Sequence, residues 1–264
     1  MQKRPSVLTI AGSDSGGGAG IQADLKTIAW FAVHGASAIT AITAQNSREV
    51  TAVFALPDSI IEAQVDAVMR DLRPSVVKIG MLGTEKAVIL VEKKLREWKP
   101  KHIVLDPVMI ASSGAKLLED DAIAALRSRL VPLATVVTPN WPEAEALIGR
   151  RIEGLEGVDQ AAEAFSSMNA RAVLLKGGHL AGEEVVDMLI EPGEVTRFRH
   201  PRLQQAEGHG TGCALASAVA AGLALGLELK EACRKATDFV HDVLARRYAV
   251  GNSKENYLGI LPIR

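Results

Sequence analysis

The sequence alternates short apolar runs with longer amphipathic segments, and this alternation limits the fold more than any other feature. Apolar runs of this length, ended by Gly, Pro or polar residues, predict buried strands, and the periodic segments between them predict helices. The expected strands are residues 7–11, 37–44, 52–56, 76–81, 102–107, 135–138 and 172–176. The expected helices are residues 19–34, 57–70, 84–98, 119–130 and 158–168, with another starting at Asn140. Repeated strand–helix units predict an α/β protein with a mainly parallel sheet and helices on both faces.

The rest of the chain adds a hairpin and a helical region. Residues 184–190 and 195–198, joined by Pro192-Gly193, are expected to form a β-hairpin or two short strands, and a mostly helical region follows as far as Tyr248. No repeat, low-complexity tract or long linker divides the 264 residues. Since α/β folds of this length are routinely one unit, we expect residues 1–264 to form a single domain.

Charge and composition exclude several classes of partner. The formal net charge of -1 offers no basic surface to DNA or RNA, and an aromatic content of 4% argues against base stacking. Residues 214–227, the most apolar run, are fewer than the roughly 20 needed to span a bilayer, so they predict a buried helix. There is no signal-peptide core, and Cys213 and Cys233 lack the spacing of a zinc site or disulfide scaffold. We expect a cytoplasmic protein that binds neither nucleic acid nor membrane.

Polar residues follow five of the expected strands. In parallel α/β sheets, ligands bind beyond the carboxyl ends of the strands. These residues can therefore face one cleft, and they are Asp14, Gln45, Asp106, Asn140 and Lys176.

The heptad Glu207-Gly208-His209-Gly210-Thr211-Gly212-Cys213 opens directly into the apolar run 214–227. Its glycines allow backbone N–H groups and the positive end of the helix dipole to face one volume, which suits an anion. A thiol at a helix start is placed where a thiolate is stabilised, so Cys213 is a candidate base or nucleophile. The alternative is a turn followed by a small buried cysteine.

Carboxylates at two strand ends suit a magnesium site. Asp106 precedes Pro107 at the end of a strand, where it is either a Mg²⁺ ligand or part of an Asp-Pro turn. Asn140 and Glu143 have the spacing of a capping box, which would explain both without a metal, yet the same placement puts Glu143 near a Mg²⁺ site.

Two further segments bear on phosphate binding. Lys176 precedes Gly177-Gly178, so it is either a phosphate ligand or an exposed strand-end lysine, while His179 and His209 receive no role. The glycine loop 16–20 lacks the dinucleotide fingerprint, and no P-loop motif occurs. Asp24, one turn into the following helix, is either solvent-facing or a pocket residue.

Six segments together closely resemble the hydroxymethylpyrimidine/phosphomethylpyrimidine kinases of thiamine biosynthesis, a branch of the ribokinase-like superfamily. The most specific are GAGIQADLKT at 18–27 and HGTGC at 209–213. The others are 78–82, 105–109, 138–143 and 175–179.

The resemblance implies a three-layer αβα sandwich, a homodimer and the use of ATP with Mg²⁺. The implied reaction phosphorylates a pyrimidine hydroxymethyl group and then the resulting monophosphate. Cys213 would be the base, and an unperturbed thiol pKa near ~8.5 would have to be lowered, which a helix N-terminus can do. The other roles are an anion hole from Gly210, Thr211, Gly212 and Cys213, Mg²⁺ binding by Asp106 and Glu143, ATP contact by Lys176, and a pyrimidine pocket from Gly12, Asp24, Gln45, Met81 and Val108.

Three other functions remain open from the sequence. The nearest is a pyridoxal kinase of the same branch, although the Gln45 amide can match the donor and acceptor of an aminopyrimidine, and Met81 and Val108 can pack its faces. A thiol-dependent acyl transferase or hydrolase would pair Cys213 with His209. A non-catalytic vitamin sensor would keep the pocket without turnover.

Overall fold

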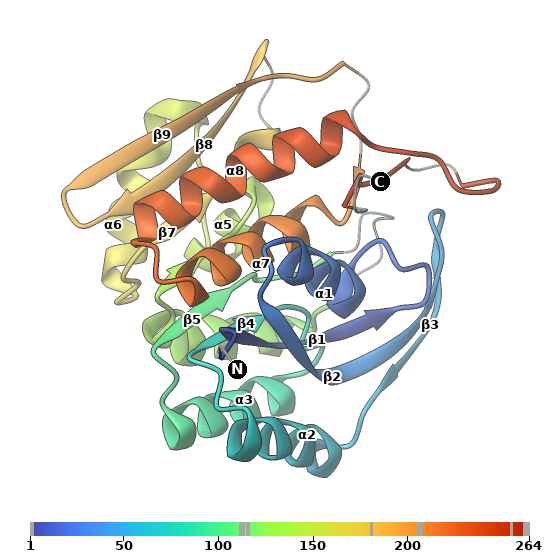
Figure 1. Cartoon of the computed structure of the whole chain (residues 1–264). Coiled ribbons are helices and arrows are strands. Elements are labelled where there is room, and N and C mark those ends of the chain that lie inside the picture. Colours follow the sequence, from blue (N-terminus) through green and yellow to red (C-terminus); the bar gives the residue numbers. More distant parts are fainter. Residues whose placement is uncertain are drawn as a thin grey trace.

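The computed structural model describes residues 3–110, 114, 117–179, 182–204, 208–253 and 256–260. In this part of the chain, nine strands form one sheet in the order β3-β2-β1-β4-β5-β6-β7-β8-β9 (Figure 1). The strands are β1 Ser6–Asp14, β2 His34–Gln45, β3 Val50–Ala55, β4 Val76–Ile79, β5 His102–Leu105, β6 Val136–Val137, β7 Val173–Leu175, β8 Glu184–Glu191 and β9 Glu194–Pro201. The helices are α1 Gly20–Trp30, α2 Asp58–Asp71, α3 Glu85–Trp98, α4 Asp120–Ala125, α5 Trp141–Ile148, α6 Val158–Ser167, α7 Thr211–Ala224 and α8 Leu229–Ala245.

The six inner strands, from β2 to β7 in the sheet order, are parallel to one another, while β3, β8 and β9 pair antiparallel at the two ends. Neighbouring residues in these strands point to opposite faces of the sheet. Val76 and Val104 thus belong to one buried cluster, while Val77 and Leu105 belong to the other. The predicted α/β fold with a mainly parallel sheet is confirmed.

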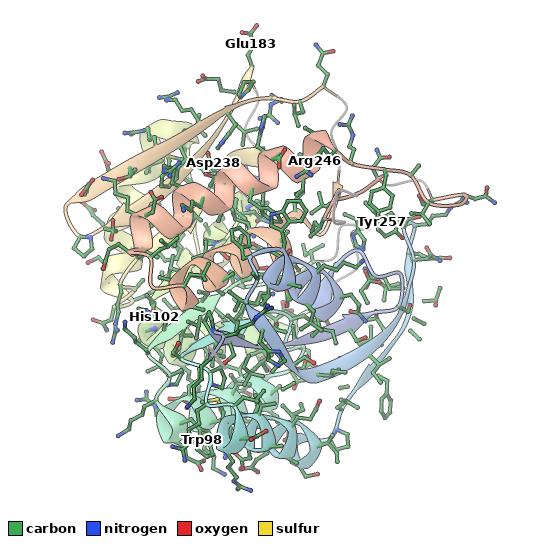
Figure 2. The ribbon with its side chains drawn as sticks, in the orientation of Figure 1. Trp98, His102, Glu183, Asp238, Arg246 and Tyr257 are labelled. Carbon is green, nitrogen blue, oxygen red and sulfur yellow. The ribbon has the colours of Figure 1, made fainter. Side chains whose placement is uncertain are left out.

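Helices cover both faces of the sheet, which makes the three layers visible in Figure 1. The α2 to α6 side contributes one apolar core with Val65, Val91 and Phe165. Helices α1, α7 and α8 pack on the other face, where α7 is buried over Ala214 to Leu223, as its apolar sequence predicts. Charged side chains such as Asp238 and Arg246 lie along the outer helix α8, as Figure 2 shows. Within the described residues, no helix combines the length and apolar character required to cross a bilayer.

Several boundaries differ from the expected ones. Strand β1 continues through Gly12 to Asp14, because Ser13 and Asp14 pair with Ile42 and Thr43 of β2. The helix expected at 119–130 is α-helical only to Ala125 and then continues as one π-helical turn, Leu126–Leu130. A short parallel pair that the sequence did not indicate, β10 Gly208–His209 and β11 Asn256–Tyr257, joins the tail to the glycine-rich heptad. The first residue of that heptad, Glu207, lies outside the described residues.

Candidate active site

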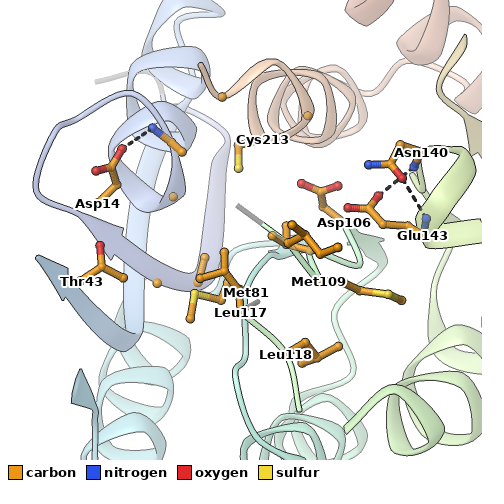
Figure 3. A pocket seen from close by; sticks show the side chains of 18 of the residues that line it. Asp14, Thr43, Met81, Asp106, Met109, Leu117, Leu118, Asn140, Glu143 and Cys213 are labelled. Atoms are coloured by element: carbon orange, nitrogen blue, oxygen red, sulfur yellow. Dashed lines mark hydrogen bonds between the residues drawn. The ribbon is translucent and has the colours of Figure 1, made fainter. Parts of the chain in front are cut away.

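A cavity of about 750 Å³ lies beyond the carboxyl ends of β1, β2, β4 and β5, between the starts of α1, α5 and α7. Figure 3 shows Asp14 and Thr43 on one side of it, Asn140 and Glu143 on the other, and Cys213 and Asp106 between them. All but one of the residues expected at the site line this cavity. They are Gly12, Gln45, Met81, Asp106, Val108, Glu143, Lys176, Gly210, Thr211, Gly212 and Cys213. The exception is Asp24.

The start of α7 depends on Gly210, which is its N-cap and has a φ of 84°. A Cβ at this position would lie 1.9 Å from the carbonyl oxygen of Gly18, so only glycine brings the heptad and the first glycine loop this close. At Gly212 a Cβ would lie 3.1 Å from Nζ of Lys176. The N-terminus of α7 and an ammonium group therefore face the same volume, which favours an anion there.

Lys176 is held by two carboxylates, one directly after β5 and one in the first turn of α5. Its Nζ lies 3.0 Å from Oδ1 of Asp106 and 3.4 Å from Oε2 of Glu143. Burial alone would lower the pKa of Lys176, but the carboxylates of Asp106 and Glu143 raise it above its usual value, so the side chain stays cationic. Burial and Asp106 raise the pKa of Glu143, while Lys176 opposes this shift.

The capping box predicted at α5 is present. Oδ1 of Asn140 accepts from the N–H of Glu143 at 2.8 Å, and Oε2 of Glu143 accepts from the N–H of Asn140 at 2.8 Å. This structural role accounts for both residue types. The box also fixes the Glu143 carboxylate at the cavity wall, so the two roles weighed from the sequence are compatible.

The residues present fit a hydrated divalent cation. Oδ2 of Asp106 is buried without a hydrogen-bond partner in the described structure, while Oδ1 is bonded to Lys176. No group of three or more His, Cys, Asp or Glu side chains in the described residues is arranged to hold a metal ion by itself. Mg²⁺ usually takes one or two carboxylates and completes its shell with water and phosphate oxygens, so Asp106 with Glu143 is a sufficient protein contribution.

Cys213 lies in the first turn of α7, with part of its side chain facing the cavity. The backbone N–H of Gly20, the first residue of α1, donates a hydrogen bond to its sulfur. Our expectation that the helix N-terminus lowers the thiol pKa is wrong. Burial raises the pKa to about 12, because it outweighs the ammonium of Lys78 and the Gly20 N–H, and Asp24 and Asp106 add to the rise.

The opposite part of the cavity is apolar. Met81 is buried, and a Cβ on Gly12 would lie 2.9 Å from its sulfur, so Gly12 makes room for the methionine. Val108 also lines the cavity, as do three apolar residues that no sequence pattern indicated, Met109, Leu117 and Leu118 (Figure 3). They lie on the long segment after β5, where no regular period marks them as pocket residues.

The Gln45 side chain is held at the rim by polar neighbours. Its Oε1 accepts from the hydroxyl of Thr43 at 3.1 Å, and its Nε2 lies 3.4 Å from Nε2 of His209. Asp14 accepts from the N–H groups of Gly16, Gly18 and Ala19 and lies 2.9 Å from His209. Burial would raise the pKa of Asp14, but these hydrogen bonds lower it overall. His209, which received no role from the sequence, therefore links the two glycine-rich loops.

Asp24 does not line the cavity, contrary to the expected pocket role. It is fully buried, and both of its oxygens lie 2.9 Å from Nζ of Lys78. It lies one turn inside α1 and is buried between that helix and the sheet, where Thr9 and Ser217 also donate to it. Lys78, which no sequence argument assigned, takes the place at the cavity wall. A lysine within the otherwise apolar strand 76–79 was the signal that could have identified it.

Comparisons with known proteins agree on one family. The family model described as phosphomethylpyrimidine kinase matches residues 14–257. A hydroxymethylpyrimidine/phosphomethylpyrimidine kinase of Rhizobium meliloti is 48% identical over 94% of this chain and 94% of its own. The thiamine biosynthesis bifunctional protein ThiED of Geobacter sulfurreducens is 46% identical over 90% of this chain, which spans 48% of that longer protein.

Solved structures of two kinds of kinase resemble the fold. Phosphomethylpyrimidine kinase from Clostridium difficile matches with a TM-score of 0.81 and 41% identity over 90% of this chain and 99% of its own. Pyridoxal kinase from Staphylococcus aureus in complex with AMP-PCP and pyridoxal matches with a TM-score of 0.89 and 32% identity over 98% of this chain and 95% of its own.

Proposed function

The chain belongs to the phosphomethylpyrimidine kinase family, and on this premise we propose the reaction that its site performs. ATP phosphorylates the hydroxymethyl group of 4-amino-5-hydroxymethyl-2-methylpyrimidine and then the monophosphate, giving the diphosphate used in thiamine diphosphate biosynthesis. One observation carries the proposal: the N-terminus of α7, Lys176 and Asp106 meet at one end of a cavity whose other end is apolar. That arrangement suits the transfer of a phosphoryl group to a small, flat ring compound.

The apolar end binds the pyrimidine. Met81 and Val108 pack against the faces of the ring, and Gly12 leaves the space that Met81 occupies. The Gln45 amide pairs with the ring nitrogen and the exocyclic amino group, since one amide offers an acceptor and a donor. Thr43 and His209 contact the amide in the described structure, and they orient it toward the ring. This placement directs the hydroxymethyl group toward Cys213.

The polar end holds the transferred phosphate. Backbone N–H groups of Gly210 to Cys213 and the ammonium of Lys176 stabilise the charge on the phosphoryl oxygens during transfer. When bound, Mg²⁺ neutralises charge between the phosphates of ATP. The Oδ2 atom of Asp106 and the second carboxylate oxygen of Glu143 would hold it, directly or through water.

Cys213 accepts the proton of the substrate hydroxyl. In that step the O–H bond breaks, its proton passes to the thiolate, the oxygen bonds to the γ-phosphorus, and the bond to the departing ADP oxygen breaks. A thiol whose pKa is about 12 is mostly protonated at neutral pH, and only its thiolate fraction can accept the proton, so the groups that favour the thiolate decide how large the active fraction is.

The homodimer implied by the family resemblance is also part of the proposal. Strand β3 lies at an edge of the sheet, and its Phe54 is 63% exposed beside Ile42 of β2, which is 49% exposed. Paired apolar side chains on an exposed sheet face favour contact with a second copy. Light scattering measures the molecular mass of the wild type and of Phe54→Asp in solution, and an unchanged mass in the variant would oppose the proposed dimer.

Both cysteines are free thiols, which suits the cytoplasm that we propose as the location of the protein.

The reaction is tested by offering ATP and Mg²⁺ with the hydroxymethylpyrimidine, its monophosphate or pyridoxal, and resolving the products by mass. We expect pyrimidine mono- and diphosphate from the wild type, and loss of most turnover with retained pyrimidine binding in Cys213→Ala. Phosphorylation of pyridoxal alone would favour the vitamin kinases that share this fold and would remove the role of Gln45. If Cys213→Ala kept full turnover, the thiol would not be the base.

A further inference from the structure

A buried ion pair contacts Ser217, which lies one helical turn after Cys213 on α7. Lys78 and Asp24 both have fully buried side chains, and Nζ of Lys78 is 2.9 Å from each carboxylate oxygen. Removing two charges from water costs free energy that their attraction often fails to repay, so such a pair seldom adds stability over apolar residues of similar size. Its presence inside an otherwise apolar layer therefore suggests a role other than stability.

Two helix starts connect the pair to the thiol. Gly20, whose N–H donates to the sulfur of Cys213, is four residues before Asp24 on α1. Ser217 is four residues after Cys213 on α7, and its hydroxyl donates to Oδ1 of Asp24 at 2.8 Å. Residues four apart lie on the same face of a helix, so α1 carries the carboxylate and a donor to the thiol, while α7 carries the thiol and a donor to the carboxylate.

The sheet supplies the cation. Lys78 is two residues after Val76 on β4 and so points to the face covered by α1 and α7. Thr9 of the neighbouring strand β1 donates to Oδ2 of Asp24 at 2.6 Å, which completes the bonds to the carboxylate. At Gly80 a Cβ would lie 2.9 Å from Nζ of Lys78, so a glycine there leaves room for the ammonium at the cavity wall.

We propose that Lys78 and Asp24 are positioning residues that control the electrostatic environment of Cys213. Lys78 favours the thiolate, and Asp24 holds the ammonium in place while limiting its effect. Only the catalytic consequence of this arrangement rests on the proposed kinase function. Asp24 is thereby part of the site without touching the substrate.

The charges around the thiol give the two residues opposite effects. Burial raises the pKa of Cys213, Lys78 from β4 lowers it, and Asp24 from α1 and Asp106 after β5 raise it. Lys176, after β7, is also coupled to the thiol. Removing the charge of Lys78 should therefore disfavour the thiolate, whereas removing the charge of Asp24 should favour it. If the pair served only packing, the two substitutions would not have opposite effects on the thiolate.

The test is the rate at which iodoacetamide alkylates Cys213 in the full chain, followed by peptide mass from roughly pH 6 to 10. In this range a thiol whose pKa is about 12 is mostly protonated, so the rate follows its small thiolate fraction. At a given pH we expect alkylation to slow by about three- to tenfold in Lys78→Met and to accelerate by a similar factor in Asp24→Asn. One pKa unit changes the thiolate fraction tenfold, and the accompanying change in nucleophilicity offsets part of it. The double variant should return toward the wild-type rate.

Controls separate charge from loosened packing. Ser217→Ala removes a hydrogen bond to Asp24 but no charge, so its alkylation rate should stay closer to the wild type than that of either charge variant. Thermal unfolding identifies variants that do not fold, and Cys233, which is fully buried, reports global opening if it is alkylated as well. Alkylation rates that change in the same direction in both charge variants, or that change in neither variant, would overturn the proposal.

Kinetics then separate this inference from the proposed function. For Lys78→Met we expect a lower kcat for pyrimidine phosphorylation with little change in KM, because the side chain acts on the thiol and not on the ring. If the wild type phosphorylates no pyrimidine while the alkylation rates shift in opposite directions, the proposed function fails and the electrostatic role of the pair stands. If the wild type phosphorylates the pyrimidine but the two charge variants do not change the alkylation rate in opposite directions, the proposed function stands and the electrostatic role of the pair fails.

Discussion

Replacing Gly210 by alanine tests how the anion hole is built, and Gly226 offers a matched control at the other end of α7. The two glycines have nearly the same backbone conformation, with φ of 84° and 86°. A Cβ at Gly210 would lie 1.9 Å from the carbonyl oxygen of Gly18, whereas a Cβ at Gly226 would have no atom within 4 Å. The left-handed conformation costs alanine roughly 1–2 kcal/mol, so both variants should lose about that much free energy of unfolding.

The clash adds a second cost only at Gly210. Overpacking a tight contact costs about 1–3 kcal/mol more, and relief requires the 16–20 loop or the first turn of α7 to move. Displacing these N–H donors should lower kcat by about 10²-fold or more. Urea denaturation and steady-state kinetics of both variants against the wild type measure the two effects. Equal losses of stability in the two variants, or an unchanged kcat in Gly210→Ala, would refute the argument that this close approach builds the anion hole.

Two other sites give predictions of a different kind. For Gln45→Ala we expect KM for the pyrimidine to rise about tenfold or more while KM for ATP changes little, since a lost pair of amide hydrogen bonds costs roughly 1–3 kcal/mol. An equal rise of KM for both substrates would contradict the pocket role of Gln45. Hydrogen bonds in the folded state lower the pKa of Asp14 below its ordinary 3.8. The stability that the Asp14 carboxylate contributes is therefore present above pH 3.8 and is lost as the pH falls through the lower folded-state pKa. Acid unfolding of Asp14→Asn should therefore depend less steeply on pH than that of the wild type, and parallel curves would argue against this linkage.

Local features of the fold were readable from the sequence because they depend on residues a few positions apart. Thr84 accepts from the N–H of Ala87 as the predicted cap of α3, and Asn140 with Glu143 forms the predicted capping box of α5. The alternation of strands and helices follows from hydrophobic periods of the same short range. Strand ends were less predictable, and the end of β1, for example, is set by pairing with β2 rather than by its own glycines.

The cleft at the strand ends was also predictable, because parallel strands that alternate with helices bring their carboxyl ends to one edge. That rule placed Asp106 and Lys176 in one site across 70 positions of sequence. It does not cover Asp24, whose pocket role came from the family resemblance, because the rule concerns residues that follow strands, and Asp24 lies inside a helix whose buried face only the packed structure defines.

The sequence determined the order of elements, the glycine-rich turns and the chemistry available at the strand ends, since each is encoded within a few residues. Tertiary structure alone decided which charges meet: Lys78 and Asp24 pair across 54 positions, and Asp14 and His209 across 195. It also decided the sign of the pKa shift at Cys213, where burial outweighs the Lys78 ammonium and the Gly20 N–H. Desolvation and Coulomb interactions depend on distances and dielectric inside the folded core, and no local pattern of residues specifies those quantities.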